Sequence, residues 1–384
     1  MDFRFTPEQE ELRERVRAFA EEKITPIASE CDESYSVRWD LIKLLADAQL
    51  FRYVIPEEYG GFGISSTNIC IIREELSSVC FAADEAFTMQ GLGSYPISSF
   101  GTEEQKKRYL PGVATGEKLI SFCLTEPVAG SDVVGIESTA TLDGNSWVLN
   151  GVKRFVSKPE DASLFTVFAK TEPEKGAKGI SAFILEGGQS DFDARTDKLI
   201  VACPIGEIIL TNCRIPRENL LGKTGEGMKI ALNNLTLFRG TVGASALGCA
   251  RSAFEQAVEY AKNRRMFGSA LIDFQVTQFK LAEMATELDA ARLLVYRSAW
   301  MADHTKVDSR KESSMAKYYA CEMAQKVIDE AVQLYGGLGI VKRQRVEFLY
   351  RAIRALRMVE GTTEIQKLTI ARQILKEHGI ALRP

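Results

Sequence analysis

Histidine is almost absent from the sequence, and this limits the chemistry that the chain can perform. Only His304 and His378 occur among the 384 residues. A histidine-based metal site or a Ser-His-Asp triad is therefore not easily assembled. The 8 cysteines include no Cys-x-x-Cys pair, and several stand in apolar stretches, as buried free thiols of a reducing compartment do. We expect no bound metal.

An excess of charge of one sign is also missing. The 52 acidic and 48 basic residues leave a formal net charge of −4 and are spread along the chain. A nucleic-acid partner requires a basic surface, which this distribution does not predict. No apolar run approaches the length of a bilayer span, and the first residues lack the basic-then-apolar pattern of a signal peptide. We expect a cytoplasmic protein without membrane or nucleic-acid partners.

Familiar motifs for nucleotides and nucleophiles are lacking as well. No Gly-x-Gly-x-x-Gly follows a predicted strand, and the chain has neither a Walker phosphate loop nor a Gly-x-Ser-x-Gly nucleophile elbow. If the chain binds a dinucleotide, it must hold it by another arrangement.

The hydrophobic period changes twice along the chain, and this predicts three domains. Helical spacing of apolar residues predicts an α-helical domain over 1–118 and an α-helical bundle over 228–384, with long helices from about Met228 to Asn263 and from Phe274 to about Asp303. Between them, 119–227 holds short β-branched and aromatic runs, which are typical of a small β-barrel or sandwich. A chain of this length exceeds one hydrophobic core, so several domains are expected.

Local signals indicate where several elements begin or end. Thr6-Pro-Glu-Gln9 and Thr102-Glu-Glu-Gln105 are capping boxes, which predict helix starts. The segments 56–61 and 91–96 are rich in glycine and proline and predict breaks between helices. Asp143-Gly-Asn145 lies between two strand-like runs and predicts a hairpin turn.

Three stretches at predicted junctions combine glycine with hydroxyl or charged residues, namely 124–132, 263–268 and 335–339. Each has an ordinary structural explanation, because glycines commonly end helices, hydroxyls bond within turns and arginines face solvent. Taken singly, none of them predicts a function.

Together with further motifs, these stretches resemble the acyl-CoA dehydrogenase family over essentially the whole chain. The motifs occur in the family's order and with its spacing. They are Pro-Glu-Glu-Tyr-Gly-Gly (56–61), Phe-Gly-Thr-Glu-Glu-Gln-Lys (100–106), Leu-Thr-Glu-Pro-Val-Ala-Gly-Ser-Asp (124–132), Arg-Arg-Met-Phe-Gly (264–268), Gln-Leu-Tyr-Gly-Gly-Leu-Gly (333–339) and Glu-Gly-Thr-Thr-Glu-Ile-Gln (360–366).

The resemblance implies a fold, a cofactor and partners. It implies an N-terminal α-helical domain, a middle β-domain and a C-terminal four-helix bundle, in agreement with the periodicity. It also implies FAD, bound between the β-domain and the bundle and completed by a neighbouring subunit of a homotetramer. The implied activity is that of an oxidoreductase that oxidises an acyl-CoA and passes the electrons to an electron-transfer flavoprotein.

The resemblance also assigns roles to individual residues. Glu360 matches the catalytic base, and Arg239 matches a residue that helps to hold CoA. Ser131, Val359 and Gly361 match positions at the substrate. The positions that match FAD contacts are Phe122, Leu124, Thr125, Ser131, Phe155 and Ser157 in the β-domain, Arg264, Phe267, Gln275, Gln333, Gly336 and Gly337 from a neighbouring subunit, and Thr362 and Glu364 from the original subunit.

A carboxylate at Glu360 suits the implied reaction. Removal of the proton α to a thioester carbonyl needs one base, one hydride acceptor and two hydrogen-bond donors on the carbonyl oxygen. By resemblance, those donors are the backbone N–H of Glu360 and a ribityl hydroxyl of the flavin. A plain structural reading, in which Glu360 is favoured by the dipole at a helix N-terminus, stays open.

The sequence departs from the family's usual pattern near the expected flavin and substrate. Phe155 stands where tryptophan is usual, Lys158 where a small polar residue is usual, and Val359 where tyrosine is frequent. The segment 197–204 is shorter and more apolar than its counterpart, and Ala352 replaces a common aspartate. These departures predict an atypical acyl group.

Three alternatives to dehydrogenation of an acyl-CoA stay open. The same fold and chemistry can run in reverse and reduce an enoyl-CoA. The acyl group can be carried by an acyl carrier protein, although Arg239 favours CoA. A catalytically inactive flavin-binding protein is the third alternative, because a fold does not determine a function. Retention of Glu360 argues against an oxygenase or an oxidase.

Overall fold

The computed structural model describes residues 4–188, 191–305 and 307–380, which fall into two compact units. Each unit joins segments that are distant in the sequence. None of the helices seen in these ranges has an apolar stretch of the length that a bilayer crossing requires. The helical unit comprises the chain up to Asp32, Ser65–Asp84 and the chain from Thr236 onward, and the sheet unit comprises Glu33–Ile64 and Glu85–Leu235.

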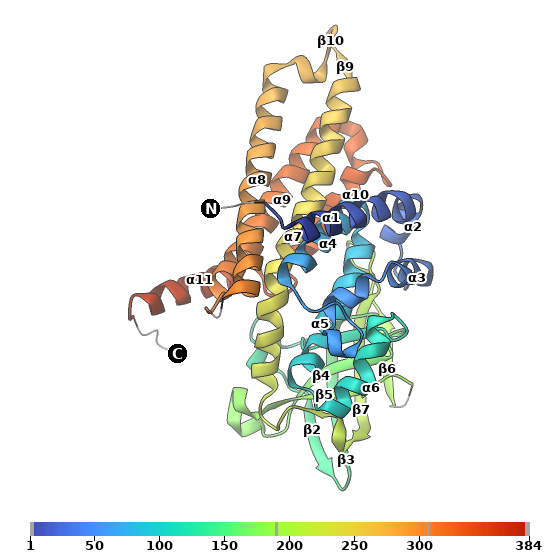
Figure 1. Ribbon diagram of the computed structural model, residues 1–384, viewed down its shortest axis with the longest axis vertical. Coiled ribbons are helices and arrows are strands. Elements are labelled where there is room, and N and C mark those ends of the chain that lie inside the picture. The colour runs from blue at the N-terminus through green and yellow to red at the C-terminus, as the bar shows by residue number, and fades with distance from the viewer. Residues whose placement is uncertain (1–3, 189–190, 306, 381–384) are drawn as a thin grey trace. The chain divides into compact units, whose positions relative to one another are not determined.

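Long helices make up most of the helical unit. They are α1 (Pro7–Phe19), α2 (Thr25–Asp32), α4 (Ser66–Val79), most of α7 (Gly227–Asn263), α8 (Gln275–His304), α9 (Arg310–Tyr335), α10 (Arg345–Leu356) and α11 (Thr363–Glu377). The α9 helix packs against α8, α10 and α11, and α8 also contacts α4. A short hairpin of β9 (Arg265–Met266) and β10 (Ser269–Ala270) links α7 to α8 (Figure 1). The α9 helix is therefore placed to hold the elements that follow it.

An eight-stranded sheet forms the core of the sheet unit. Its strands are β1 (Ile120–Cys123), β2 (Thr139–Asp143), β3 (Ser146–Ser157), β4 (Leu164–Lys170), β5 (Ile180–Glu186), β6 (Phe192–Thr196), β7 (Ile205–Pro216) and β8 (Leu220–Leu221). The order is β6-β7-β3-β2-β4-β5-β8, and β1 pairs in parallel with β4. The helices α3 (Trp39–Asp47) and α6 (Glu103–Ala114) and part of α5 (Phe81–Phe100) belong to the same unit. Every residue of β5 is buried, so the core lies at this strand.

The local signals in the sequence are largely confirmed. Thr6 and Thr102 cap α1 and α6 with complete capping boxes. The β2 and β3 strands pair in antiparallel fashion around Gly144, whose φ of 61° is the left-handed value that the predicted turn requires. On α8, Met284 and Leu288 are buried at the predicted helical spacing. These features depend on neighbours within a few residues, which is why the sequence reveals them.

The predicted break at 91–96 is wrong, because this segment lies inside α5. Pro96 has no N–H, so the carbonyl of Leu92 loses the helical partner that it would otherwise have. The side chain of Asn234 replaces that partner, since its Nδ2 donates to the Leu92 carbonyl oxygen at 2.8 Å. A contact that is distant in the sequence therefore overrides the local turn signal.

The sheet unit buries an ion pair beside the motif 124–132. Lys153 on β3 and Glu126 have side-chain exposures of 0% and 3%, and their charged atoms are in contact. Glu126 also accepts hydrogen bonds from the backbone N–H groups of Glu137 and Ser138. Burial by itself raises the pKa of Glu126, but Lys153 and these hydrogen bonds hold that pKa below its ordinary value. Burial lowers the pKa of Lys153, and the Glu126 carboxylate acts in the opposite direction, so each group supports the charge of the other in a region that excludes water.

Replacement of Lys153 by methionine should lower the free energy of unfolding by roughly 3–5 kcal/mol, because it leaves the Glu126 carboxylate buried without a counterion. The matched control is Arg214→Met, which breaks an exposed pair between Arg214 on β7 and Asp143. That change should cost less than about 1 kcal/mol. Urea denaturation followed by tryptophan fluorescence measures both variants. An equal loss of unfolding free energy in the two variants would show that the buried Lys153–Glu126 pair contributes no more to stability than the exposed pair.

Candidate active site

Glu360 stands on a left-handed turn between two helices. The α10 helix ends at Leu356, and α11 begins at Thr363. Between them, Glu360 has a φ of 53° and Gly361 a φ of 96°. A left-handed backbone is uncommon for a residue with a side chain and costs free energy that surrounding contacts must offset. The chain therefore maintains a strained conformation at the residue that the sequence predicts to be the base.

Glu322 of α9 ties together the two ends of this turn. Its Oε1 accepts a hydrogen bond from Arg357 Nε at 2.9 Å and another from Thr363 Oγ1 at 2.7 Å. The backbone N–H of Thr363 donates to the Arg357 carbonyl at 3.2 Å. The entry and the exit of the turn are thus held at a fixed separation.

Two buried donors bind the carbonyl oxygens within the turn. Lys317 Nζ of α9 donates to the Gly361 carbonyl oxygen at 3.0 Å. Gln366 Nε2 of α11 donates to the same oxygen at 2.8 Å and to the Glu360 carbonyl oxygen at 3.2 Å. Within the described ranges, no backbone carbonyl accepts from the N–H of Glu360. That N–H is thus left available to a ligand.

One oxygen of the Glu360 carboxylate is withdrawn from water. Its Oε2 is buried and has no hydrogen-bond partner among the described residues. Burial raises the pKa of Glu360 above its ordinary value, while the positive charges of Arg73, Arg239 and Lys317 act in the opposite direction. A carboxyl group with a raised pKa is a better proton acceptor than an exposed one once it has ionised. The environment of Glu360 suits a general base.

Arg73 and Arg239 are buried cations of the helical unit. Arg73 donates to the two carboxylate oxygens of Asp84 at 2.8 and 3.1 Å and to Thr241 Oγ1 at 2.8 Å. Arg239 differs, because its Nε is buried without a hydrogen-bond partner among the described residues. Buried polar atoms are normally paired, so an unpaired one indicates a position that a polar ligand can complete.

Thr125 and Ser131 belong to a loop that is fixed to the sheet. Glu126 and Ala129 exchange two backbone hydrogen bonds of 3.0 and 3.2 Å, which close the loop into a tight turn. The buried contact between Lys153 and Glu126 fastens this turn to β3. Ser131 is exposed at the far side of the turn. The predicted hydroxyl donors are therefore carried by a rigid loop.

Three further predicted cofactor residues lie at the ends of neighbouring strands. Phe122 packs edge-on against Phe168, with ring centroids 5.0 Å apart. Leu124 is buried directly after β1. Ser157 is buried at the end of β3, and its carbonyl oxygen accepts a hydrogen bond from the hydroxyl of Ser121. Packing within the sheet thus holds each of them in place.

Phe155 lies at an irregularity in β3. The pairing of β3 with β7 shifts register between Arg154 and Val156, and Phe155 has a φ of 55°. Bulges of this kind re-aim a side chain and are over-represented beside active sites. The ring of Phe155 is 57% exposed, and the Arg154 guanidinium lies 5.6 Å from its centroid. The sheet therefore presents an aromatic face to a ligand at this point.

Lys158 introduces a buried ion pair where the family usually has a small polar residue. Its Nζ lies 2.8 Å from each carboxylate oxygen of Glu85. Lys158 has a φ of 51° and is 2% exposed. The lysine at this position therefore gives the sheet unit a second buried ion pair.

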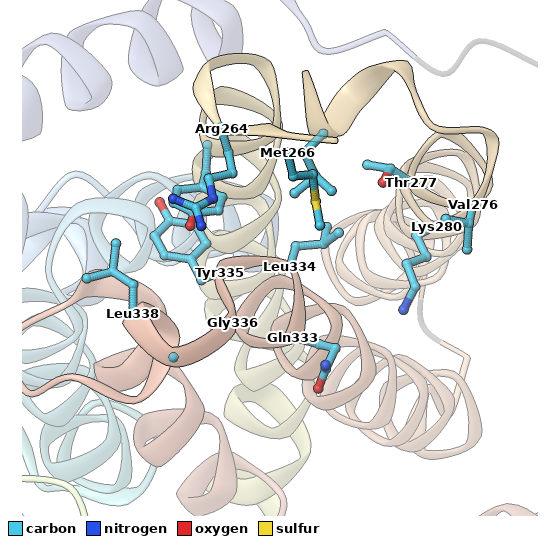
Figure 2. A pocket seen from close by; sticks show the side chains of 13 residues that line it. Arg264, Met266, Val276, Thr277, Lys280, Gln333, Leu334, Tyr335, Gly336 and Leu338 are labelled. Atoms are coloured by element: carbon cyan, nitrogen blue, oxygen red, sulfur yellow. The ribbon is translucent and has the colours of Figure 1, made fainter. Parts of the chain in front are cut away.

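A cavity of about 580 Å³ lies in the helical unit, at the end of α7, the start of α8 and the end of α9 (Figure 2). The rings of Tyr260 and Tyr335 stack at its wall, with centroids 4.2 Å apart. The lining residues are Tyr260, Arg264, Met266, Leu271, Val276, Thr277, Lys280, Gln333, Leu334, Tyr335, Gly336, Gly337 and Leu338.

Four predicted cofactor residues, Arg264, Gln333, Gly336 and Gly337, line this one cavity. Arg264 forms no ion pair with any carboxylate of the described chain. A Cβ atom placed on Gly336 or Gly337 would meet no atom within 4 Å, so both glycines border open space. A guanidinium pairs with phosphate, and glycine lets a ligand approach the backbone closely. The cavity therefore fits the pyrophosphate of a dinucleotide such as FAD.

The other cofactor residues predicted in the helical unit lie outside the cavity wall. Gln275 is the first residue of α8, beside two lining residues. Phe267 stands at the tip of the β9–β10 hairpin with a φ of 49°, and its ring is 89% exposed. Thr362 caps α11, and Glu364 is exposed in the first turn of that helix.

The sequence analysis missed Arg73, Asp84 and Lys317. A signal for Lys317 was present, because it occupies the same face of a helix as Ser313 and Ala320, both small and buried. A lysine within a stripe of small residues indicates a buried charge with a purpose. No comparable signal joins Arg73 to Asp84, since the two lie on different helices.

Three family models match the chain in order. The acyl-CoA dehydrogenase N-terminal domain matches residues 6–117, the middle domain matches 121–213, and the C-terminal domain matches 225–375. The first helical segment of the sequence, the strands that follow it and the second helical segment therefore correspond to the three domains of one family.

Curated relatives match along nearly the full length of the chain. A 3-(aryl)acrylate reductase of Clostridium sporogenes is 40% identical over 377 residues, which are 97% of this chain and 100% of the relative. An acryloyl-CoA reductase (NADH) of Anaerotignum propionicum is 39% identical and covers 98% and 96%. The CarC subunit of the caffeyl-CoA reductase-Etf complex of Acetobacterium woodii is 36% identical and covers 97% and 100%.

Solved structures match equally well. The butyryl-CoA dehydrogenase of Megasphaera elsdenii superposes with a TM-score of 0.93 at 34% identity and covers 98% of this chain and 100% of that one. An FAD complex of PigA superposes with a TM-score of 0.90 at 27% identity and covers 97% and 99%. These matches confirm the predicted fold class, and the chain therefore belongs to the acyl-CoA dehydrogenase family as an oxidoreductase that uses FAD.

Proposed function

We propose that the chain catalyses the α,β-dehydrogenation of an acyl-CoA thioester to the enoyl-CoA, with Glu360 as the base. The observation that carries this proposal is the Glu360 carboxylate. It has a buried oxygen without a partner, a raised pKa and a strained backbone that several side chains maintain. Strain and a shifted pKa together are typical of a residue kept for function rather than for stability.

The chain's own groups supply the proton transfer and the alignment of the thioester. Glu360 removes the proton from the carbon α to the carbonyl group. The free backbone N–H of Glu360 donates to the carbonyl oxygen and stabilises the negative charge that develops there. Arg239, with its unpaired buried Nε, helps to hold the CoA moiety. Ser131, Val359 and Gly361 border the acyl group.

FAD, when bound, supplies the acceptor for the hydride that leaves the β-carbon. We propose that the loop with Thr125 and Ser131 and the neighbouring strand ends hold the flavin ring, and that the α7–α9 cavity of a neighbouring subunit holds the pyrophosphate and adenosine. The full set comprises Phe122, Leu124, Thr125, Ser131, Phe155, Ser157, Arg264, Phe267, Gln275, Gln333, Gly336, Gly337, Thr362 and Glu364.

We also infer that the chain acts as a homotetramer and transfers electrons to an electron-transfer flavoprotein. The largely exposed ring of Phe267, at the strained hairpin tip, supports contact with a second subunit. The relationship to a subunit of a reductase-Etf complex supports the electron-transfer flavoprotein. The 8 buried free cysteines agree with a reducing compartment and hence with the cytoplasm.

Reduction of an enoyl-CoA is the second candidate function. The names of three relatives at 36% to 40% identity, from Clostridium sporogenes, Anaerotignum propionicum and Acetobacterium woodii, each describe a reductase. The same groups serve both directions, because Glu360 would return a proton to the α-carbon in the reverse reaction. The bound flavin's reduction potential and the available electron partner decide the direction.

Replacement of Glu360 by glutamine should leave a yellow, folded protein and lower the rate of flavin bleaching by substrate at least about a hundredfold, because an amide cannot accept the α-proton. In the wild-type protein the bleaching rate should fall as the pH decreases through the raised pKa of Glu360, since the base is then protonated. Anaerobic stopped-flow absorbance measures both effects. Glu377→Gln, on the exposed part of α11, serves as the matched control. Bleaching of Glu360→Gln at the control rate would contradict the assignment.

Arg264→Met and Gly337→Val should each weaken FAD binding, the first by removing a phosphate partner and the second by filling the open space in the cavity. Arg265→Met is the matched control, because Arg265 is the next residue and does not line the cavity. The ratio of flavin to protein after extensive dialysis measures the effect. Loss of FAD in the Arg265 variant alone would place the phosphate site elsewhere.

Anaerobic titration of the purified yellow protein with a panel of acyl-CoA thioesters tests the direction of the reaction. If the chain is a dehydrogenase, one or more saturated thioesters will bleach the flavin absorbance. If it is a reductase, enoyl-CoA thioesters will instead restore the colour of the chemically reduced protein. A protein that responds to neither group of compounds would support an inactive flavin-binding protein.

A further inference from the structure

We propose that Lys317 is a positioning residue for Glu360: its ammonium group binds the Gly361 carbonyl and so fixes the backbone that carries the base. This inference rests on the proposed role of Glu360. It concerns a residue that neither touches the reacting atoms nor belongs to the predicted cofactor set.

The position of Lys317 is costly unless it serves a purpose. Its side chain is completely buried, yet it forms no ion pair with any carboxylate of the described residues. Its one recorded hydrogen bond goes to the Gly361 carbonyl oxygen, at 3.0 Å. Burying an ammonium group with only a neutral acceptor opposes folding. A methionine of similar length would fit an apolar core at lower cost, so stability does not explain the lysine.

The hydrogen bond from Lys317 is made to the residue directly after the base. Gly361 follows the base directly, and both residues are left-handed, with φ of 96° and 53°. The Gly361 carbonyl oxygen accepts hydrogen bonds from Lys317 on α9 and from Gln366 on α11, so side chains of two helices bind the same oxygen. Gln366 also binds the Glu360 carbonyl oxygen, so both peptide groups that follow the Glu360 Cα are held. The two donors therefore restrain the backbone directly after the base, on which the direction of the Glu360 side chain depends.

Neighbouring contacts on α9 support the same reading. Cys321 Sγ lies 3.4 Å from the Leu356 carbonyl oxygen, and Glu322 binds Arg357 and Thr363. Lys317 stands about one turn before both of them on the same helix. One face of α9 thus contacts both ends of the link between α10 and α11. Of these three α9 residues, Lys317 is the one that contacts the residue beside the base.

The charge of Lys317 adds a second, separable effect. The groups whose charges act on Glu360 come from several elements of the helical unit, and Lys317 is one of three cations that offset the effect of burial. Removal of this cation should make Glu360 harder to ionise. The charged and titratable groups in this environment are Arg73 on α4, Asp84 on α5, Arg239 on α7, and Lys317, Cys321 and Glu322 on α9.

A set of substitutions separates the position of the base from its charge environment. Lys317→Arg keeps a cation, Lys317→Gln keeps a donor without the charge, and Lys317→Met keeps neither. Lys326→Met is the control, because Lys326 lies on α9 but is 58% exposed and pairs with Glu287. Each variant is loaded with FAD, and only variants whose melting temperature equals that of the wild type are compared.

The readout is exchange of the α-proton for deuterium in D₂O, measured by mass spectrometry. The probe is a short-chain β-thia acyl-CoA, in which sulfur replaces the β-carbon. Glu360 can take its α-proton and return a deuteron, but no β-hydrogen is present to leave as hydride. The assay therefore reports on the base without flavin reduction.

We expect exchange at the high-pH plateau to fall about tenfold to a hundredfold in Lys317→Met, since a small displacement of a catalytic group has effects of this size. The acidic limb of the pH profile should move to higher pH in Lys317→Met and Lys317→Gln and stay near the wild-type position in Lys317→Arg. If Lys317→Met does not fold, the role of Lys317 is tested by comparing Lys317→Gln with Lys317→Arg. The pH at which exchange falls off on the acidic side should be higher in Lys317→Gln.

Two failures are distinguishable. Equal exchange by the wild type and Glu360→Gln would overturn the proposed function and this inference with it. A different result would overturn only the role of Lys317. In that case Glu360→Gln loses exchange, but every Lys317 variant keeps the plateau and the acidic limb of the wild type.

Discussion

The helical unit must keep the carboxylate of Glu360 away from water and still allow it to ionise, and the rest of that unit depends on this constraint. Burial raises the pKa of Glu360, and the positive charges of the buried cations around it act in the opposite direction. Those cations need their own support, which Arg73 finds in Asp84 and Thr241. The packing of α4, α7 and α9 thus serves a local electrostatic balance as well as the hydrophobic core.

Much of the fold follows from short-range signals in the sequence. The capped starts of α1 and α6, the hairpin at Gly144 and the long α7 and α8 helices were predicted within a residue or two. The β6 strand cannot be recognised from apolar runs, because its charged, half-exposed residues lie at the sheet edge and, among the described strands, pair with β7 alone. The domain boundaries at 118 and 227 stay predictions, since the compact units combine distant segments that periodicity cannot connect.

The candidate site was predictable only where a motif carries it. Glu360 and the cavity residues Arg264, Gln333, Gly336 and Gly337 were identified from their motifs, and the last four line one cavity. The left-handed backbone of Glu360 was not foreseen, because glutamate has no intrinsic preference for it. Lys317 was missed although its place in a stripe of small residues signalled a buried charge. Its partner is a backbone oxygen 44 residues away, which no side-chain pattern reveals.

The proline within α5 has a consequence for how this chain can change during evolution. Pro96 leaves the Leu92 carbonyl without a helical partner, and Asn234 on α7 fills that role from 142 positions away. Loss of Asn234 should be harmful while Pro96 is present, because the Leu92 carbonyl is then left without either partner, and should be better tolerated after the proline is replaced. The order in which the two positions mutate therefore matters, and they are expected to vary together among descendants of this sequence rather than independently.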